Sequence, residues 1–405
     1  MLDHRQLGRE LEIFHPHPLV GAGLPIWLPN GAAVRYAIEG YLREVERLGG
    51  YQHVYSPPIA KQEMYERSGH LANFADDMFP PMVDPDGGEA MMLRPSLCPH
   101  HAMVYQAKGR SYRELPLRIG EFGGQYRAER SGVLSGLSRV RSIWLNDGHV
   151  FCAPEQASDE LSAVLADIDK AHRALGFRAE AFRLSLRGDL GGAGKYVGAP
   201  AEWDRAEKLL RDVLVAAGVP FYEKSGEAAF YGPKIDIQIR DVAGREMSLA
   251  TIQVDFAQPE RFGLEYVDAG GARRRPLMLH RSIGGGMERL VGHLLEVHQG
   301  ALPAWYAPVQ LVVAPVAEAQ DDAARRLADA ALRLGLRAQV SHDGSLGLRI
   351  REAIGKKVPY VAVIGAREAA DDEVSLRLRG GAQLPAMRSA EALGFIAKEA
   401  AVPQA

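Results

Sequence analysis

The chain contains only two cysteines in its 405 residues, Cys98 and Cys152. Two cysteines cannot form the disulfide framework that holds small secreted domains together, and they fit a reducing compartment. The sequence also lacks any run near the roughly 20 apolar residues that cross a bilayer, and its charged start, MLDHRQLGRELEIF, has no apolar leader segment. We therefore expect a cytoplasmic protein that does not associate with a membrane.

A strong charge of one sign is missing as well, because the formal net charge is only -3. Attraction to nucleic acid would therefore have to come from local basic patches. The glycine-rich run GDLGGAGKYVGAP, residues 188–200, lacks the spacing of a phosphate-binding Walker loop, so we expect an ordinary loop there. Length and an ordinary hydrophobic content of 47% allow two or three domains with well-filled cores.

Two regions differ in their pattern of predicted elements. Up to residue 303, strands that are mostly adjacent in sequence alternate with helices at residues 31–48, 154–175 and 201–217, which favours a largely antiparallel sheet surrounded by helices. Asn30 is a plausible cap for the first of these helices. From residue 304 to 405, strands alternate regularly with helices, as in a small α/β domain. We expect an α+β protein with domains at residues 1–303 and 304–405.

Most of the chemically distinctive residues fall between residues 121 and 149, EFGGQYRAERSGVLSGLSRVRSIWLNDGH. The pattern predicts two strands joined by a Gly- and Ser-rich connector over residues 130–138. Alternation would place Arg127 and Glu129 on one face. A guanidinium binds phosphate with two hydrogen bonds and a carboxylate accepts one from an amine, so this pair suits an anionic group attached to a base. A surface hairpin with solvated charges explains the same residues.

Three separated segments resemble the signature motifs of the class II aminoacyl-tRNA synthetases. GYQHVYSPPI at residues 50–59 resembles motif 1, FGGQYRAERSG at 122–132 resembles motif 2, and GGGMERL at 284–290 resembles motif 3. The segments DHRQLGRELEIF, RSGHLANF, RPSLCPHHAMVY, EAAFYGPKIDIQIRD and PLMLHRS resemble the threonyl-tRNA synthetase family in the same order. The resemblance covers essentially the whole chain. It implies an antiparallel class II catalytic domain followed by an anticodon-binding α/β domain.

The resemblance also implies the chemistry, which is activation of threonine by ATP with Mg²⁺ and transfer of the threonyl group to tRNA(Thr). Arg127 would hold the substrate carboxylate and the α-phosphate, Glu129 the adenine amine and Arg289 the γ-phosphate, with Arg139 beside the nucleotide. Tyr231, Lys234 and Gln253 fall at positions of the amino-acid pocket. His70, in SGHLANF, matches a proton acceptor of the transfer step.

Cys98, His149 and His280 carry no local metal-binding spacing, and each alone is more simply a buried core residue. In the family, however, all three positions are ligands of one zinc ion. Three protein ligands leave an open position, as in catalytic zinc sites. Zinc could then bind the amino and hydroxyl groups of threonine while Asp147 accepts from the hydroxyl, and valine would leave these polar groups unsatisfied.

The resemblance further implies a homodimer, formed through the helix before motif 1 and the strand after it. In the C-terminal domain, Arg349, Arg351, Glu352, Lys356 and Lys357 form a basic helix face. Contact with RNA and a solvated face of paired charges explain it equally well.

Several residues depart from the family pattern near the nucleotide. Ile143 stands where an aromatic residue usually stacks on adenine, Trp144 and Leu145 replace a Thr-Gln pair, and Leu249 lies in another altered stretch. Loss of base stacking would cost about 1–3 kcal/mol. Trp144 would point to the opposite face from its neighbours. The glycine run at residues 284–286 is expected to be more flexible than the motif 3 of the family.

These departures leave two further hypotheses open. One is a specialised paralogue that activates a β-hydroxy amino acid for another acceptor, or that serves as an inhibitor-tolerant copy. The other is a non-catalytic binding or regulatory protein derived from a synthetase. The sequence also starts at the catalytic core, without the editing region of full-length bacterial members. We therefore expect measurable transfer of serine, which lacks only a methyl group worth about 1–3 kcal/mol of discrimination.

Overall fold

The computed structural model describes residues 1–83, 85–188 and 196–405. Its contacts divide the chain into two compact units. The smaller unit comprises Met1–His17, Pro25–Tyr41 and Val291–Gln404, and the larger comprises Pro18–Leu24, Leu42–Leu290 and Ala405. The expected boundary between residues 303 and 304 stays a prediction. Most of the loop expected at residues 188–200 lies outside the described residues, as does residue 84.

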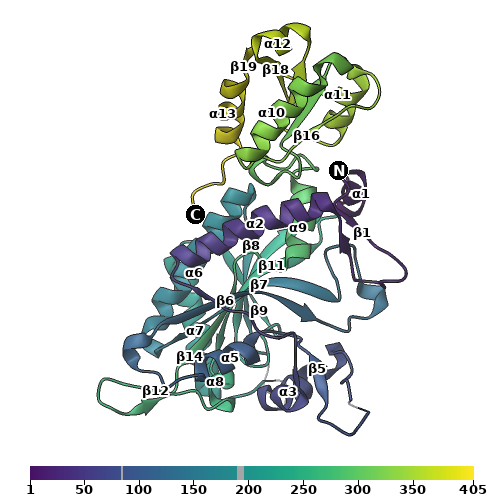
Figure 1. The fold of residues 1–405 in the computed structure, drawn as a ribbon. Coiled ribbons are helices and arrows are strands. Elements are labelled where there is room, and N and C mark those ends of the chain that lie inside the picture. Colours follow the sequence, from purple (N-terminus) through teal and green to yellow (C-terminus); the bar gives the residue numbers. More distant parts are fainter. Residues whose placement is uncertain (84, 189–195) are drawn as a thin grey trace. The chain divides into compact units, whose positions relative to one another are not determined.

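The larger unit is built on an eight-stranded sheet with the order β3-β6-β7-β14-β11-β10-β8-β9 (Figure 1). In that order the strands are Gln52–His53, Leu117–Tyr126, Ser142–Cys152, Leu277–Ser282, Glu246–Asp255, Lys234–Arg240, Ala181–Leu186 and Phe221–Ser225. Only the two outer pairs, β3/β6 and β8/β9, run parallel, and the strands between them pair antiparallel. The expected antiparallel sheet with helices around it is confirmed.

Amphipathic helices cover this sheet because their apolar residues recur every three or four positions. In α6, Ala157–Leu175, the buried stripe includes Leu161, Val164 and Ile168, and Gly176 ends the helix with a positive φ of 87°. The other helices of the unit are α3 (Gln62–Ser68), α4 (His70–Phe74), α5 (Cys98–Gln106), α7 (Pro200–Ala216) and α8 (Ala257–Arg261). Two small antiparallel pairs complete it, β4/β5 (Ile59–Lys61, Met91–Leu93) and β12/β13 (Tyr266–Val267, Arg273–Arg274).

Helices α2 (Pro29–Leu48) and α9 (Met287–Val297) each have residues in both units. The apolar stripe expected on α2 is buried at Val34, Ile38 and Leu42. The expected cap was wrong: the helix begins at Pro29, and the Asn30 amide donates instead to the Leu11 carbonyl over 2.9 Å. Proline suits the first helical turn because its missing N–H would have no partner there.

A buried arginine crosses the sheet of the larger unit over two glycines. Arg281 on β14 pairs with Gly148 on β7, which pairs in turn with Gly120 on β6. A Cβ atom on Gly148 would lie 2.3 Å from the guanidinium carbon of Arg281. The absence of both side chains therefore leaves the space in which Arg281 reaches Glu46, near the end of α2.

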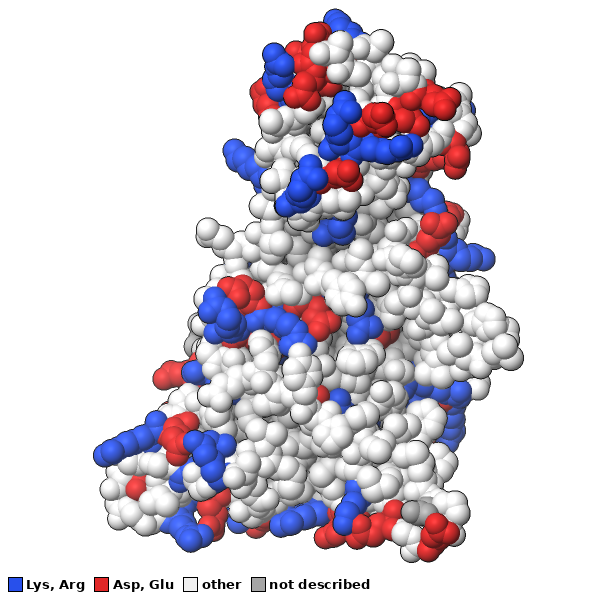
Figure 2. All heavy atoms as spheres, in the orientation of Figure 1, with Lys and Arg blue, Asp and Glu red and all other residues white. Residues whose placement is uncertain are grey.

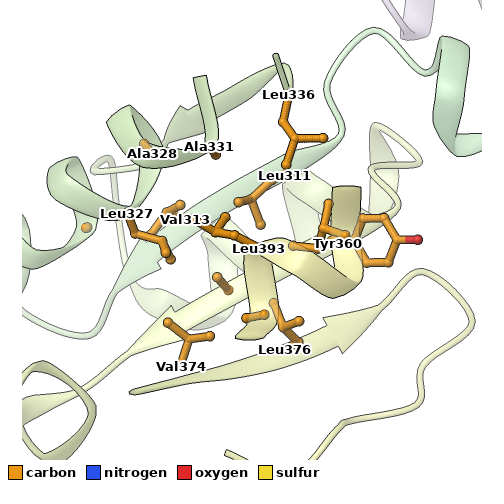
Figure 3. Close-up of a cluster of buried hydrophobic side chains, with 14 of the residues drawn as sticks. Leu311, Val313, Leu327, Ala328, Ala331, Leu336, Tyr360, Val374, Leu376 and Leu393 are labelled. Atoms are coloured by element: carbon orange, nitrogen blue, oxygen red, sulfur yellow. The ribbon is translucent and has the colours of Figure 1, made fainter. Parts of the chain in front are cut away.

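The smaller unit contains a five-stranded sheet of order β16-β15-β17-β18-β19, in which β16, β15 and β17 run parallel. These strands are Ala338–Val340, Leu311–Pro315, Tyr360–Ile364, Glu373–Leu378 and Met387–Arg388. Helices α10 (Asp321–Arg333), α11 (Leu346–Gly355), α12 (Ala366–Asp371) and α13 (Ser389–Glu399) alternate with them, so the α/β pattern expected here is confirmed. Leu311, Val313 and Leu376 meet helix residues such as Leu327 and Leu393 in its core (Figure 3).

The remaining elements of the smaller unit come from the N-terminus: α1 (His4–Glu10), β1 (Phe14–His15) and β2 (Ile26–Trp27). Single-turn 3₁₀ helices occur along the chain at Ala75–Asp77, Tyr112–Glu114, Ser131–Val133, Pro154–Gln156, Ala304–Tyr306 and Glu318–Gln320. Among the described residues, no helix has the length and apolar content that crossing a bilayer requires. On the face shown in Figure 2, acidic and basic side chains are interspersed.

Candidate active site

The cavity that holds most of the expected site residues has a volume of about 320 Å³ and lies against strands β7, β14, β11 and β10 of the larger unit. Cross-strand register explains why these strands supply its wall. His149 pairs with His280, His280 with Gln253, and Gln253 with Lys234, so the four side chains form one row across four strands. Side chains in such a row share a face of the sheet. Eleven residues expected at the site line this cavity: Cys98, Arg127, Glu129, Arg139, Asp147, His149, Tyr231, Lys234, Gln253, His280 and Arg289.

One end of the cavity brings together Cys98, His149 and His280. A sulfur or ring nitrogen of each lies within 4.8 Å of the others, and all three residues are buried. Burial raises the pKa of the Cys98 thiol, so a thiolate there requires a nearby positive charge. One thiolate and two imidazoles form a donor set that suits zinc. The residues present therefore fit a zinc ion.

The neighbouring residues lie where they can contact a small polar substrate. Asp147 is buried, which raises the pKa of its carboxyl, and it accepts from the Gln125 amide over 3.3 Å. The Tyr231 hydroxyl donates to Gln253 over 2.6 Å, and its ring lies nearly parallel to that of His280, with 4.9 Å between centroids. Tyr231 is therefore held by both a hydrogen bond and stacking.

The other end of the cavity is rich in arginine. Burial, together with the positive charges of Arg127 and Arg139, lowers the pKa of Arg289 to about 10. Arg289 is fixed by donating to the carbonyls of Ser138 and Ser248, over 2.9 and 2.6 Å. Glu129 pairs with Arg139, with 2.8 Å between Oε2 and Nη2. Three guanidinium groups against one paired carboxylate leave a site that favours an anion.

The two predicted strands around this cluster pair as expected, but their ends differ. β6 ends at Tyr126, so Arg127 and Glu129 lie beyond it instead of alternating along it, and β7 begins only at Ser142. The chain stays paired just past the strand because the Arg127 N–H donates to the Arg141 carbonyl over 2.9 Å. Both predicted side chains nevertheless face the cavity.

His70 lies in a second cavity, of about 520 Å³, which shares Ser96, Arg127 and Tyr231 with the first. Its Nδ1 contacts the Ser68 hydroxyl at 2.7 Å and its Nε2 contacts the Ser96 hydroxyl at 2.8 Å. Burial lowers the pKa of His70 to about 3, so its ring is neutral at physiological pH. His70 is therefore beside the first cavity and not inside it.

The residues of β7 that depart from the family pattern divide between the two faces of the strand, and Leu249 lies on β11. Ile143 and Leu145 line the cavity, as does Leu249, whereas Trp144 is absent from its wall, as alternation predicts. The glycine run at residues 284–286 is packed tightly: Gly285 has a positive φ of 69°, and a Cβ there would lie 2.0 Å from the Leu249 carbonyl oxygen. Close approach therefore explains a glycine at this position.

Sequence reasoning missed three buried polar residues behind the cysteine–histidine cluster. His101 contacts the ring of His149 and the carboxylate of Glu121, while Asp255 contacts the ring of His280. His101 stands three residues after Cys98 on the same helix, which was the only local signal for it. No spacing pattern connects Glu121 or Asp255 to the histidines, because the contacts depend on the register of the sheet.

The basic helix face predicted in the C-terminal region is only partly available to RNA. Arg349 is buried, and its Nη1 donates to the carbonyls of Pro315 and Ser341 over 2.7 and 3.1 Å. Its role is therefore to join the ends of neighbouring segments. Lys356 pairs with Glu12, with 3.1 Å between Nζ and Oε2.

Two family models match the chain. The tRNA synthetase class II core domain (G, H, P, S and T) matches residues 82–298, more than half of the chain, and the anticodon binding domain matches residues 310–399. The chain is 45% identical over 389 residues to threonine–tRNA ligase from Levilactobacillus brevis. That match covers 96% of the chain but 60% of the relative, so the chain spans about 60% of the length of this curated protein.

Solved structures show the same likeness. The RNA binding domain of threonyl-tRNA synthetase from Cryptosporidium parvum is 32% identical with a TM-score of 0.92, and the match covers 99% of both chains. The putative threonyl-tRNA synthetase ThrRS-1 from Aeropyrum pernix is 27% identical with a TM-score of 0.83, covering 100% of this chain and 98% of that one. The fold, the two family models and the sequence identity agree, and the chain belongs to the threonyl-tRNA synthetase family of class II aminoacyl-tRNA synthetases.

Proposed function

We propose that this chain activates L-threonine with ATP to form threonyl-adenylate and transfers the threonyl group to tRNA(Thr). The observation that carries the proposal is that the arginine cluster lines the same cavity as Cys98, His149 and His280. One end suits a polyphosphate and the other suits a small polar amino acid. Adenylate formation requires the α-phosphate and the carboxylate to meet between such ends.

At the amino-acid end, Cys98, His149 and His280 would hold a zinc ion. When bound, zinc would bind the amino and hydroxyl groups of threonine. Valine keeps the amino group but has a methyl group, which is no ligand, in place of the hydroxyl. Asp147 would accept a hydrogen bond from the threonine hydroxyl, and Tyr231, Gln253 and Lys234 would line the remaining wall. The Tyr231 hydroxyl is already directed to Gln253, which fixes its ring against the substrate position.

At the nucleotide end, Arg127 would bind both the threonine carboxylate and the α-phosphate, and Arg289 the γ-phosphate, with Mg²⁺ accompanying ATP. In-line transfer needs mainly positioning and neutralisation of charge, which these two guanidinium groups supply. Glu129 would accept from the adenine amine. Arg139, which pairs with Glu129, would then orient that carboxylate while its own charge faces the phosphates.

The transfer step would use the neighbouring cavity. His70 lies there with Arg127 and Tyr231 on the shared wall, so a nucleotide entering this cavity would reach the adenylate. We propose that His70 accepts the proton of the ribose hydroxyl that attacks the threonyl carbonyl. Its Nε2 already contacts the Ser96 hydroxyl at 2.8 Å, so the ring is oriented towards the cavity.

We further propose that the protein is a cytoplasmic homodimer that binds tRNA through its C-terminal domain. The match of residues 310–399 to an anticodon binding domain supports the tRNA contact. The resemblance of residues 50–59 to motif 1 supports the dimer. Both cysteines are free thiols, which fits a reducing compartment.

The experiment that tests the activity is ATP–pyrophosphate exchange on zinc-loaded protein, with threonine, serine and valine in parallel and no tRNA. Threonine-dependent exchange that is lost in Arg289→Gln is expected, followed by charging of tRNA(Thr). Arg173→Gln, which removes an exposed arginine from α6, is the control and should retain exchange. Exchange with another β-hydroxy amino acid alone would favour the specialised paralogue, and no exchange with any amino acid would contradict the proposal.

A further inference from the structure

Each of the two histidines in the cysteine–histidine cluster has one ring nitrogen facing the other histidine and one facing a second partner. His149 Nε2 and His280 Nδ1 lie 2.9 Å apart. The opposite nitrogens contact His101 Nδ1 at 2.7 Å and Asp255 Oδ2 at 2.8 Å. A neutral imidazole carries one N–H and one lone pair, so each second partner decides which nitrogen keeps the lone pair.

His101, the second partner of His149, is oriented by Glu121 on its other side. Glu121 accepts at Oε1 from Arg94 and the Ser56 N–H, both at 3.2 Å, and at Oε2 from the Ser56 hydroxyl at 2.7 Å. Burial alone would raise the pKa of Glu121, but the hydrogen bonds from His101 and Ser56 and the charge of Arg94 lower it to about 2. Glu121 is therefore ionised and can only accept.

Because Glu121 can only accept, it determines which nitrogen carries the proton in His101 and, through His101, in His149. His101 Nε2 must donate its N–H to Glu121 Oε2, which lies 3.3 Å away. A neutral His101 then has its lone pair on Nδ1, where it accepts from the Nδ1–H of His149. The lone pair of His149 is left on Nε2, which faces His280.

Asp255 sets the proton of the other histidine directly. Its Oδ1 accepts from the N–H groups of Ala257 and Gln258, both at 2.8 Å, where it caps α8. Its Oδ2 then accepts from the Nε2–H of His280. The lone pair of His280 is left on Nδ1, and it faces the lone pair of His149.

Two lone pairs that face each other at 2.9 Å repel unless a cation lies close to both, and the Cys98 sulfur belongs to the same cluster. We propose that His101, with Glu121 behind it, and Asp255 are positioning residues that direct the lone pairs of His149 Nε2 and His280 Nδ1 at one divalent cation. Such outer contacts fix the tautomer and raise the basicity of a ligating histidine. The inference rests on the zinc site of the proposed function and adds the residues that prepare it.

The structure suggests two isosteric variants that would reverse the tautomers of the two histidines without replacing any of the three proposed zinc ligands. In Glu121→Gln, the amide oxygen takes the Oε1 position, because the Arg94 guanidinium and the Ser56 N–H there can only donate. The Ser56 hydroxyl and His101 at the Oε2 position can accept instead, so the NH₂ group faces His101 Nε2. His101 would then donate to His149 from Nδ1 and move the His149 lone pair away from the cation. In Asp255→Asn, the two backbone donors at Oδ1 likewise hold the amide oxygen and turn the NH₂ group towards His280.

The test is the affinity of the full chain for Zn²⁺, measured by competition with a chromophoric chelator, together with the d–d spectrum of the Co²⁺ form. Each variant is expected to bind Zn²⁺ roughly 10- to 100-fold more weakly and to show a weaker or shifted Co²⁺ spectrum. Glu160→Gln is the matched control, because it also removes a buried carboxylate paired with an arginine, at Arg118, and should bind Zn²⁺ as the wild type does.

A second pair of variants, both at His101, covers the case in which the isosteric variants fail to fold. His101→Asn retains an oxygen that can accept from His149 Nδ1 and should bind Zn²⁺ more tightly than His101→Leu. Equal Zn²⁺ affinity in the wild type, both isosteric variants and both His101 variants would overturn the proposal while leaving the zinc site itself in place. A wild-type chain that binds no Zn²⁺ or Co²⁺ would overturn the zinc site and this inference together, whereas loss of exchange activity alone would bear only on the proposed function.

Discussion

Arg281 and Glu46 form an ion pair in the interior of the larger unit, with 2.6 Å between Nη2 and Oε1. Neither side chain is exposed, and the guanidinium lies 4.1 Å from the centre of the Tyr51 ring. Burial alone would raise the pKa of Glu46, but the charge of Arg281 and hydrogen bonds from His53 and Asn146 lower it. The pair therefore stays charged in the folded protein. Removing one partner would leave the other as an uncompensated charge in a low-dielectric interior.

Glu46→Gln is expected to lower the free energy of unfolding by about 3–5 kcal/mol, because Arg281 would keep its charge without its carboxylate. Chemical denaturation followed by circular dichroism measures this change. Glu44→Gln, on the same helix but in an exposed pair with Arg47, is the control and should unfold at the wild-type denaturant concentration. Equal midpoints for the two variants would contradict this reading of the pair.

His293 is expected to make stability depend on pH. Burial lowers its pKa from 6.5 to about 4, opposed by the charge of Glu296. The unfolded chain therefore binds more protons below pH 6.5, so stability falls as the pH drops from 6.5 towards 4, by about 2 kcal/mol at pH 5. The measurement compares denaturation at pH 7 and pH 5 in the wild type and His293→Gln. The difference between the two pH values should shrink in the variant, and an unchanged difference would exclude His293 as a cause.

Ile143→Phe is expected to lower the KM for ATP by up to roughly tenfold, because an aromatic ring on the cavity wall would stack on adenine, a contact worth about 1–3 kcal/mol. Threonine-dependent pyrophosphate exchange at varied ATP provides the measurement. Trp144→Phe changes an aromatic residue outside the cavity wall and should leave the KM for ATP unchanged. A rise in KM for Ile143→Phe would show that the wall is too close to admit both rings.

Serine is expected to be activated with a kcat/KM roughly 10- to 200-fold below that of threonine. It retains the hydroxyl that would donate a hydrogen bond to Asp147, and it lacks only a methyl group. Valine should be rejected more strongly, since its methyl group cannot donate a hydrogen bond to Asp147. Exchange assays with each amino acid at matched ATP test this order. Valine activated as well as serine would show that the hydroxyl is not read at this site.

Removal of one positive charge from the arginine cluster is expected to weaken the binding of ATP. Addition of ATP with Mg²⁺ is expected to raise the unfolding temperature of the wild type through binding to the folded state. Arg289→Gln should lose most of this shift, because it removes a guanidinium group that lies close enough to Arg127 and Arg139 for their charges to lower its pKa. A thermal shift of wild-type size in Arg289→Gln would place the phosphates elsewhere.

The sequence predicted the elements well wherever their pattern was local. The stripe of α6, the alternating strand β10 and the strand–helix alternation of the C-terminal region each depend on neighbouring residues in the chain. The ends of β6 and the cap of α2 were predicted less well, since contacts from distant segments decide them: Arg141 holds the chain beyond Tyr126, and Leu11 binds Asn30.

At the site, the residues that line the cavity were found through the resemblance, while the residues behind them were not. His101, Glu121 and Asp255 come from a helix and two strands, and only the register of the sheet brings them to the two histidines. Arg349 shows the opposite error: its place in a basic helix suggested an RNA contact or a solvated charge, but the fold turns its side chain inward.

Because of Gly148, the cavity depends on packing on the opposite face of the sheet. The residue lies between Asp147 and His149 but faces the other side of the sheet, where its missing side chain admits Arg281. Arg281 follows His280 in the chain and is anchored to Glu46 at the end of α2. Glu46 at the end of α2 is thus connected through Arg281 to β14 and β7, the strands that carry His280 and His149. Replacing Gly148 with alanine would disturb the cluster from behind, without altering any group that a substrate meets.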